Sequence, residues 1–275
     1  MTWNLQHGGG IRTNAICNRL KTASGAQSRN PADGLSTIVL TEFRSGKTGE
    51  QIRSTLDECG FHNQAVAPTT SEKQNTVIVA SKYPFESHSF KELEKDQHRC
   101  IRAEFDHMVL YGLYFALGLK KIPLFELLCG LDPDLLKRRA ILIGDFNTGQ
   151  LSLDHEGAAF TAPEYFEKLL EQGWVDTWRS RNPNVREYSW YSRKGGKPLN
   201  GFRIDHALAT PMLDREIKDV QYLHDVREGR ACLSDHSAMV VELSSGVALG
   251  SAGLRPSENP LAGHCNGQPV PDDRS

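Results

Sequence analysis

Short runs of apolar and β-branched residues recur along the chain, and each has the length of a buried strand. Segments with a helical spacing of apolar residues separate several of these runs. The expected strands are 36–42, 75–80, 100–105, 109–115, 140–144, 203–209 and 238–243, and the expected helices are 13–23, 49–59, 122–129 and 163–172. Thr161 is the expected N-cap of the last helix. The irregular alternation indicates a strand-rich α/β domain and fits neither a Rossmann fold nor a simple barrel.

The composition changes after Leu243. Residues 245–275 are rich in glycine, serine and proline and offer almost no apolar side chains to bury. The chain as a whole is 39% hydrophobic, which is enough for one large core. We therefore predict one domain over residues 1–244 and a disordered C-terminal tail over residues 245–275.

Charge and cysteine usage exclude some classes of protein. The formal net charge of −2 is not that of a basic protein that coats nucleic acid, so a phosphate-rich partner must be held by a local patch and a cation. The six cysteines lack zinc-ligand spacing and are expected to be reduced and mostly buried. No run approaches the roughly 20 apolar residues that span a bilayer, and the first residues lack a signal core. We expect a soluble, cytoplasmic protein.

The most informative polar residues are Asp145 and Asn147, which directly follow the apolar strand expected at 140–144. On an extended backbone, two side chains at this spacing point to the same face. A carboxylate can accept a proton from an attacking water, and an amide can donate to a phosphate oxygen. The alternative, given equal weight for this segment alone, is an Asx turn that ends the strand.

Other acidic residues also lie at or within strands. Glu42 closes the strand expected at 36–42 and offers a hard oxygen ligand for Mg²⁺. Asp205 lies in an otherwise apolar strand, so it needs either Arg203 or a metal as its partner. Asp235 precedes His236 and could orient its ring and stabilise its charged form. Each of these residues has an ordinary explanation as a polar residue at the end of a strand, but so many of them at strand ends are unlikely to occur by chance.

The N-terminal segment adds Asn4 and Gln6, expected on one face of a short first strand, followed by three glycines that let backbone approach a ligand. Taken together, the sequence resembles the endonuclease/exonuclease/phosphatase superfamily, and within it the exonuclease III/abasic-site endonuclease branch. The resemblance covers about residues 1–243. Its motifs occur in the family's order: W-N-x-Q, T-E, G-L-Y-F-A, G-D-F-N, W-V-D-T-W-R-S-R-N-P, Y-S-W-Y, R-I-D and S-D-H.

The resemblance implies a four-layer α/β sandwich of the DNase I type, with two mixed or mostly antiparallel sheets face to face and helices outside. It also implies Mg²⁺, with Mn²⁺ as a substitute, but leaves open both the number of ions and whether Asp145 acts as a base or as a metal ligand. By resemblance, the site residues have these roles: Glu42 as principal metal ligand, Asn4 and Asp205 on the metal side, Asp145 for the attacking water, Asn147 and His236 on the scissile phosphate, Asp235 orienting His236, and Tyr114 on the phosphate or leaving group.

Three positions depart from the repair enzymes. Gln6 is longer than the usual Asn or Asp, which puts a second metal contact in doubt. Ala116 and Leu117 replace a proline and an amide residue after Tyr114, so one contact to the DNA backbone is in doubt. His206 stands where an aromatic or aliphatic residue is common, and we interpret it as a core histidine with its hydrogen bonds satisfied.

Two groups of residues suggest how substrate is held. Trp190 and Phe202 resemble the apolar pocket that receives a flipped-out, base-less sugar, with a core cluster as an equally weighted alternative. The basic residues that could track a phosphate backbone, or could equally form solvated faces, are Arg193, Lys194, Arg203 and Lys120.

The leading hypothesis is a monomeric Mg²⁺-dependent phosphodiesterase that acts in DNA repair as an endonuclease or 3′-exonuclease on duplex DNA, including abasic or nicked DNA. One alternative is a phosphodiesterase or phosphatase for a small or lipid-linked phosphate ester. The other is a catalytically silent binding module.

Overall fold

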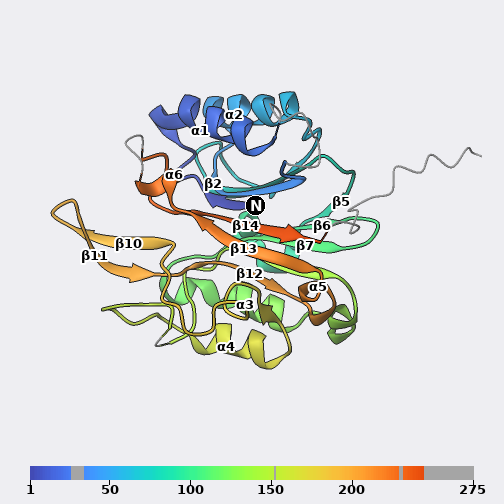
Figure 1. The fold of residues 1–275 in the computed structure, drawn as a ribbon. Coiled ribbons are helices and arrows are strands. Elements are labelled where there is room, and N and C mark those ends of the chain that lie inside the picture. The colour runs from blue at the N-terminus through green and yellow to red at the C-terminus, as the bar shows by residue number, and fades with distance from the viewer. Residues whose placement is uncertain (26–33, 152, 229–231, 245–275) are drawn as a thin grey trace, which may run out of the picture.

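The computed structural model describes residues 1–25, 34–151, 153–228 and 232–244 (Figure 1). The predicted tail at 245–275 lies outside the described residues, so both its disorder and the domain boundary at 244 stay predictions. The described strands form two six-stranded sheets and one separate hairpin.

The first sheet has the strand order β13-β14-β1-β2-β4-β3. Its strands β1 and β2 are parallel, and all its other neighbours are antiparallel. Its members are β1 (Thr2–Asn4), β2 (Thr37–Phe43), β3 (Asn63–Val66), β4 (Thr76–Ser81), β13 (Ile217–Leu223) and β14 (Ala238–Leu243).

The second sheet has the order β5-β6-β7-β8-β12-β9, and only β7 and β8 are parallel. Its members are β5 (Glu86–His88), β6 (Cys100–Glu104), β7 (Val109–Tyr114), β8 (Ala140–Asp145), β9 (Val175–Asp176) and β12 (Asp205–Ala209). The hairpin consists of β10 (Trp190–Lys194) and β11 (Lys197–Phe202), and its first strand carries the predicted basic residues Arg193 and Lys194.

Helices cover the outer face of each sheet (Figure 1). The first sheet carries α1 (Thr13–Ala23) and α2 (Lys47–Glu58), and the second carries α3 (Ile122–Cys129) and α4 (Glu164–Glu171). Pro163 is the N-cap of α4, so the prediction of Thr161 at that position was wrong. The short helices are η1 (Gly10–Arg12), η3 (Lys91–Arg99), η4 (Gly118–Lys121), η5 (Pro133–Lys137), α5 (Pro211–Asp214) and α6 (Asp225–Glu228).

Three buried apolar clusters separate the four layers. Successive strand residues point to opposite faces, and in β2 Val39 joins the cluster between the sheets whereas Leu40 joins the cluster under α1 and α2. In β8, Ile141 belongs to the central cluster and Leu142 to the cluster under α3 and α4. Strands buried on both faces read as continuous apolar runs. The predicted four-layer sandwich with outer helices is therefore confirmed.

Cysteine usage agrees with the sequence analysis. In the described part of the chain all five cysteines are free: Cys17, Cys59 and Cys100 are buried, Cys129 is partly buried and Cys232 is exposed. Across the same residues, none of the helices is long and apolar enough to cross a membrane.

Candidate active site

Three neighbouring strands of the second sheet bring three predicted site residues side by side. Tyr114 at the end of β7 is the register partner of Asp145 at the end of β8, and Asp205 at the start of β12 is the antiparallel partner of Asp145. A Cβ at Gly144 would lie 1.9 Å from the carbonyl oxygen of Leu113, so glycine permits the close approach of β7 and β8 just before Asp145. The resulting row of polar residues lies at one rim of the sandwich.

The first sheet adds Asn4 and Glu42 to the same rim. The Asn4 Nδ2 donates to Asp145 Oδ2 at 2.9 Å and to Glu42 Oε1 at 3.2 Å, so one amide joins both sheets. Glu42 has a left-handed φ of 51° where the register of β2 against β4 shifts. Such an irregularity re-aims a side chain, and strained residues concentrate at functional sites. The structure therefore places Glu42 and Asp145 together.

Asp145 and Asn147 form an Asx turn. The Asn147 backbone N–H donates to Asp145 Oδ1 at 2.9 Å, and its Nδ2 donates to the Phe115 carbonyl at 2.8 Å. Asn147 has a left-handed φ of 50°, so the expected extended backbone at this point was wrong. The turn nevertheless keeps both side chains together, because Asn147 Nδ2 also lies 3.3 Å from Asp145 Oδ2.

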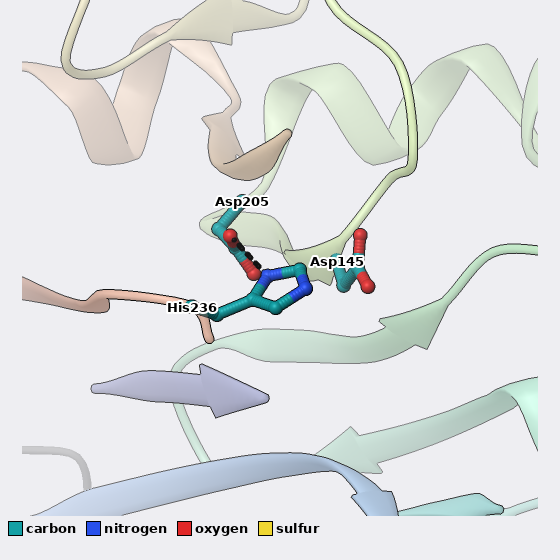
Figure 2. A group of neighbouring side chains, drawn as sticks. All are labelled: Asp145, Asp205 and His236. Atoms are coloured by element: carbon teal, nitrogen blue, oxygen red, sulfur yellow. Dashed lines mark hydrogen bonds and ion pairs between the residues drawn. The ribbon is translucent and has the colours of Figure 1, made fainter. Parts of the chain in front are cut away.

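His236 pairs with Asp205 (Figure 2). Its Nδ1 lies 2.8 Å from Asp205 Oδ2, and the ring lies between Asp205 and Asp145. Asp235 instead accepts a hydrogen bond from the Trp190 indole at 3.0 Å, so the expected orientation of His236 by Asp235 was wrong. Adjacent residues in an extended segment point in different directions. Being next to His236 in the sequence therefore does not place the Asp235 side chain beside the His236 ring. The Ser234 hydroxyl accepts a hydrogen bond from the His236 backbone N–H and donates one to the Asn4 carbonyl, which connects this turn to β1.

Burial and charge set the protonation of this pair and of Asp145. Burial raises the pKa of Asp145 to about 7; the positive charge of His236 opposes the rise, and the Asp205 carboxylate adds to it. Burial alone would lower the pKa of His236, but the charge and hydrogen bond of Asp205 outweigh it and raise the pKa to about 10. At neutral pH, His236 is an imidazolium beside a carboxylate that can accept a proton.

Tyr114 and a buried lysine complete the rim. Burial raises the pKa of Tyr114 to about 12; the Glu42 charge adds to the rise and a hydrogen bond with Asn75 opposes it, so the phenol keeps its proton. Lys121 donates to the Asn147 carbonyl oxygen, and burial lowers its pKa to about 8. Its neighbour Lys120, one of the predicted substrate-binding residues, is exposed instead.

The donor set at the rim fits a hard divalent cation. Glu42, Asp145 and Asp205 offer carboxylate oxygens, which Mg²⁺ and Mn²⁺ prefer. Asn4 turns its Nδ2 toward Glu42 and Asp145, while its Oδ1 accepts the Gln6 backbone N–H at 2.8 Å, so it positions these carboxylates. Asp205 Oδ1 is buried and has no hydrogen-bond partner among the described residues, so it retains the capacity to bind a cation. Ligand atoms of Asp145, Asp205 and His236 lie within 4.8 Å of one another, although a protonated His236 cannot itself be a ligand.

A second buried cluster, of Arg203, Asp154 and Asp176, is a structural ion-pair network. Arg203 is fully buried and donates to both carboxylate oxygens of Asp154 and both of Asp176. The predicted role of Arg203 in substrate binding was therefore wrong, because its guanidinium faces these carboxylates and has no exposed surface. His206 is a core histidine as predicted, with Nε2 2.8 Å from the Thr148 carbonyl. Its hydrogen bonds are not all satisfied as expected, because the buried Nδ1 lies 3.5 Å from Asp176 Oδ2 and has no hydrogen-bond partner among the described residues.

The remaining substrate-binding candidates lie on the β10–β11 hairpin. The rings of Trp190 and Phe202 are 5.7 Å apart, and the Trp190 ring is 6.3 Å from that of His236. Both aromatic side chains are half-buried, whereas Arg193 and Lys194 are exposed farther along the hairpin. The hairpin therefore connects two exposed cations to the neighbourhood of His236.

Solved structures of other proteins share this fold. An AP endonuclease from Archaeoglobus fulgidus has a TM-score of 0.69 and 21% identity, with 88% of this chain and 97% of that chain covered. The 3′ phosphatase NExo from Neisseria, bound to a product DNA hairpin, has a TM-score of 0.70 and 22% identity, with 88% and 98% covered. The 3′-5′ exonuclease NExo from Neisseria meningitidis has a TM-score of 0.69 and 21% identity, with the same coverage.

No protein-family model and no curated protein gives a significant match to the sequence. The structural likeness covers most of the chain and confirms the predicted DNase I-like fold.

Proposed function

We propose that this chain is a Mg²⁺-dependent phosphodiesterase that cleaves DNA in repair, as an endonuclease or 3′-exonuclease of the exonuclease III type. The observation that carries the proposal is the Asn4 amide, which joins Glu42 to Asp145 beside the His236–Asp205 pair. The proteins of similar structure include an AP endonuclease and a 3′ phosphatase bound to product DNA, which supports DNA as the substrate.

Glu42 would hold the cation, with the free Oδ1 of Asp205 as a further candidate ligand. Asn4 would set the metal site by donating from Nδ2 to both Glu42 and Asp145. A bound divalent ion supplies charge neutralisation and polarises the phosphoryl oxygens. Asp145 takes the proton from the attacking water as a general base.

The other rim residues act on the phosphate. The charged His236 binds a non-bridging oxygen, where negative charge grows in the transition state. Asn147 is held by the Asx turn in position to contact the same group. Tyr114 keeps its proton and can donate it in a hydrogen bond to the phosphate or the leaving oxygen. In this scheme, Asp205 orients His236 and Asp235 fixes Trp190.

DNA would cross the rim beside the hairpin. Trp190 and Phe202 would receive a sugar, while Arg193, Lys194 and Lys120 would contact neighbouring phosphates. We further infer a monomeric, cytoplasmic enzyme whose duplex substrate includes abasic or nicked DNA.

A lipid-linked or other apolar phosphate ester is the second candidate. Leu117 and Leu119 follow Tyr114 closely, and their exposed fractions are 76% and 66%. Exposed apolar side chains beside a phosphate site favour a substrate with an apolar part.

One assay separates the two candidates. Purified protein is incubated with Mg²⁺ and with abasic duplex DNA, nicked DNA, RNA, a chromogenic diester or a phospholipid, and each reaction is repeated in EDTA. We expect cleavage of duplex DNA that EDTA abolishes. Cleavage of the phospholipid alone would favour the second candidate, and full activity in EDTA would contradict a metal-dependent reaction. The Glu42→Gln variant should need more Mg²⁺ for the same rate.

A further inference from the structure

Asn75, which the sequence analysis did not single out, lies against Glu42. It precedes β4, next to the register shift in β2 that carries Glu42. Its Oδ1 accepts a hydrogen bond from Arg44 Nε at 2.7 Å, and its Nδ2 donates to Glu42 Oε2 at 2.9 Å. Nδ2 also lies 3.0 Å from His7 Nδ1. Asn75 therefore sits at the centre of a small polar network behind the proposed metal ligand.

The orientation of the Asn75 amide is determined by its two charged neighbours. A guanidinium only donates hydrogen bonds, so the oxygen of the amide must face Arg44. A carboxylate only accepts them, so the nitrogen must face Glu42. Rotating the amide by 180° would place two donors against each other at one end and two acceptors at the other. Arg44 thus ensures that Asn75 presents its N–H groups to Glu42.

The two oxygens of Glu42 have different partners. Oε2 accepts from the Asn75 amide and, at 2.8 Å, from the backbone N–H of His7, and the His7 Nδ1 lies 3.0 Å from it. In the described part of the chain, Oε1 accepts one longer hydrogen bond, at 3.2 Å, from Asn4, which also binds Asp145. Oε1 therefore faces Asn4 and, through it, Asp145, and it keeps free acceptor capacity, whereas Oε2 is held from the opposite side.

We propose that Asn75, oriented by Arg44, is a positioning residue that fixes Glu42 with Oε1 directed at the metal. The inference rests on the proposed function, because it assumes that Glu42 is a metal ligand. A glutamate side chain loses considerable rotamer freedom when it is ordered, and the hydrogen bond from Asn75 orders it before the cation arrives. Groups that orient a metal ligand in this way typically contribute about 10–100-fold to metal affinity.

Metal binding without substrate tests this role. Mn²⁺ affinity is measured by isothermal titration calorimetry and by electron paramagnetic resonance for the wild type, Asn75→Leu and Asn63→Leu. Leucine has the same branched arrangement of side-chain heavy atoms as asparagine, but it neither donates nor accepts a hydrogen bond. Asn63 is the matched control, since it lies on the edge strand β3 and its amide bonds to the Ser81 carbonyl at 3.4 Å. We expect Asn75→Leu to bind Mn²⁺ about 10–100-fold more weakly and the control to bind as the wild type does.

A double-mutant cycle shows whether Asn75 acts through Glu42. If it does, Asn75→Leu should have no further effect on Mn²⁺ affinity in a Glu42→Gln background. Arg44→Met should weaken Mn²⁺ binding in the wild-type background, because the amide loses the group that orients it. Arg44→Lys should restore part of that loss, since lysine can still donate to Asn75 Oδ1. Asn75→Ser, which removes the same amide, replaces Asn75→Leu if circular dichroism shows that the leucine variant is unfolded.

Each result decides one of the two claims. Wild-type Mn²⁺ affinity in the folded Asn75 variant, or an equal loss in the wild-type and Glu42→Gln backgrounds, would overturn the positioning role while leaving the metal site intact. A wild-type protein that binds no Mn²⁺, or a Glu42→Gln protein that binds it as tightly as the wild type, would overturn the proposed metal ligand and the positioning role with it.

Discussion

Asp205 Oδ2 lies 2.8 Å from His236 Nδ1, and both side chains are buried where β12 of one sheet meets the turn before β14 of the other. The pair is formed across the sandwich by residues far apart in the chain. Its carboxylate keeps the imidazole charged in a place where burial alone would make it neutral.

Asp205→Asn should therefore shift the alkaline limb of the pH–rate profile to lower pH. His236 has a pKa raised from 6.5 to about 10, so its positive charge is present below that value and is lost as the pH rises through it. Without the Asp205 charge, the proton leaves at a lower pH, and turnover at pH 8 should fall about 10²–10³-fold, as for other lost transition-state charge stabilisers. Rates measured from pH 5 to 10 test this. An unchanged limb would mean that His236 is not the charged group.

The same pair affects stability with a defined sign. A histidine whose folded pKa lies above its unfolded value adds stability that is fully present below pH 6.5 and disappears as the pH rises through about 10. The melting temperature of Asp205→Asn should thus differ most from the wild type at acidic to neutral pH and approach it above pH 10.

Asp145→Asn should abolish most activity and stabilise the metal-free protein. General-base help is typically worth 10²–10⁴-fold, so turnover should fall at least about a hundredfold. Burial raises the pKa of Asp145 from 3.8 to about 7, so ionising it costs folding free energy once the pH exceeds 3.8. The amide avoids this cost. The melting temperature of Asp145→Asn should exceed that of the wild type at pH 8, and the difference should vanish near pH 4.

Circular dichroism melts in EDTA and turnover in Mg²⁺ measure the two effects separately. If folded Asp145→Asn kept more than about a tenth of wild-type turnover on every phosphodiester, the general-base role would be excluded.

The strands that are buried on both faces could be predicted from the sequence alone, because their apolar runs are unbroken. It did not predict β13, whose exposed Lys218 and Asp219 interrupt the apolar pattern, or the hairpin, whose tips are exposed. Strand-end polar residues such as Glu42 and Asp145 were found because a carboxylate after a buried run is conspicuous.

Partners across the sheets could not be read in the same way. Asp235 is adjacent to His236 in the chain, but the fold turns it toward Trp190. Arg203 read as a basic surface residue because nothing in the sequence indicates that Asp154 and Asp176 converge on it. Nothing in the sequence indicated a functional role for Asn75, since a single asparagine at the start of a strand is typical of a turn.

Arg203→Met should destabilise the protein without acting on DNA affinity directly. It leaves the buried carboxylates of Asp154 and Asp176 without their shared cation, and breaking a buried pair in this way typically costs about 3–5 kcal/mol. For a domain of this size, each kcal/mol lowers the melting temperature by roughly 2–4 °C. Arg186→Met removes an exposed arginine and is the control. An unchanged melting temperature with weakened DNA binding would restore Arg203 to the substrate-binding residues.

Arg193→Ala and Lys194→Ala should weaken DNA binding in a salt-dependent manner. Both cations are exposed on the hairpin whose base, Trp190, lies beside His236, so a duplex that reaches the rim passes close to them. Each phosphate contact releases counterions and contributes about −0.9 to the slope of log affinity against log salt. The double variant should therefore bind duplex DNA with a slope that is shallower by up to about two.

Fluorescence anisotropy with labelled duplex DNA measures this slope, in an Asp145→Asn background so that the DNA stays intact. Lys218→Ala is the control, because it removes one exposed positive charge from β13, where Lys218 pairs with Glu242. Its slope should equal that of the parent protein. If the hairpin variant and this control shared the parent's slope and affinity, the hairpin would not contact phosphates. Leu117 and Leu119 would then be the next surface to test, with phospholipid vesicles in place of DNA.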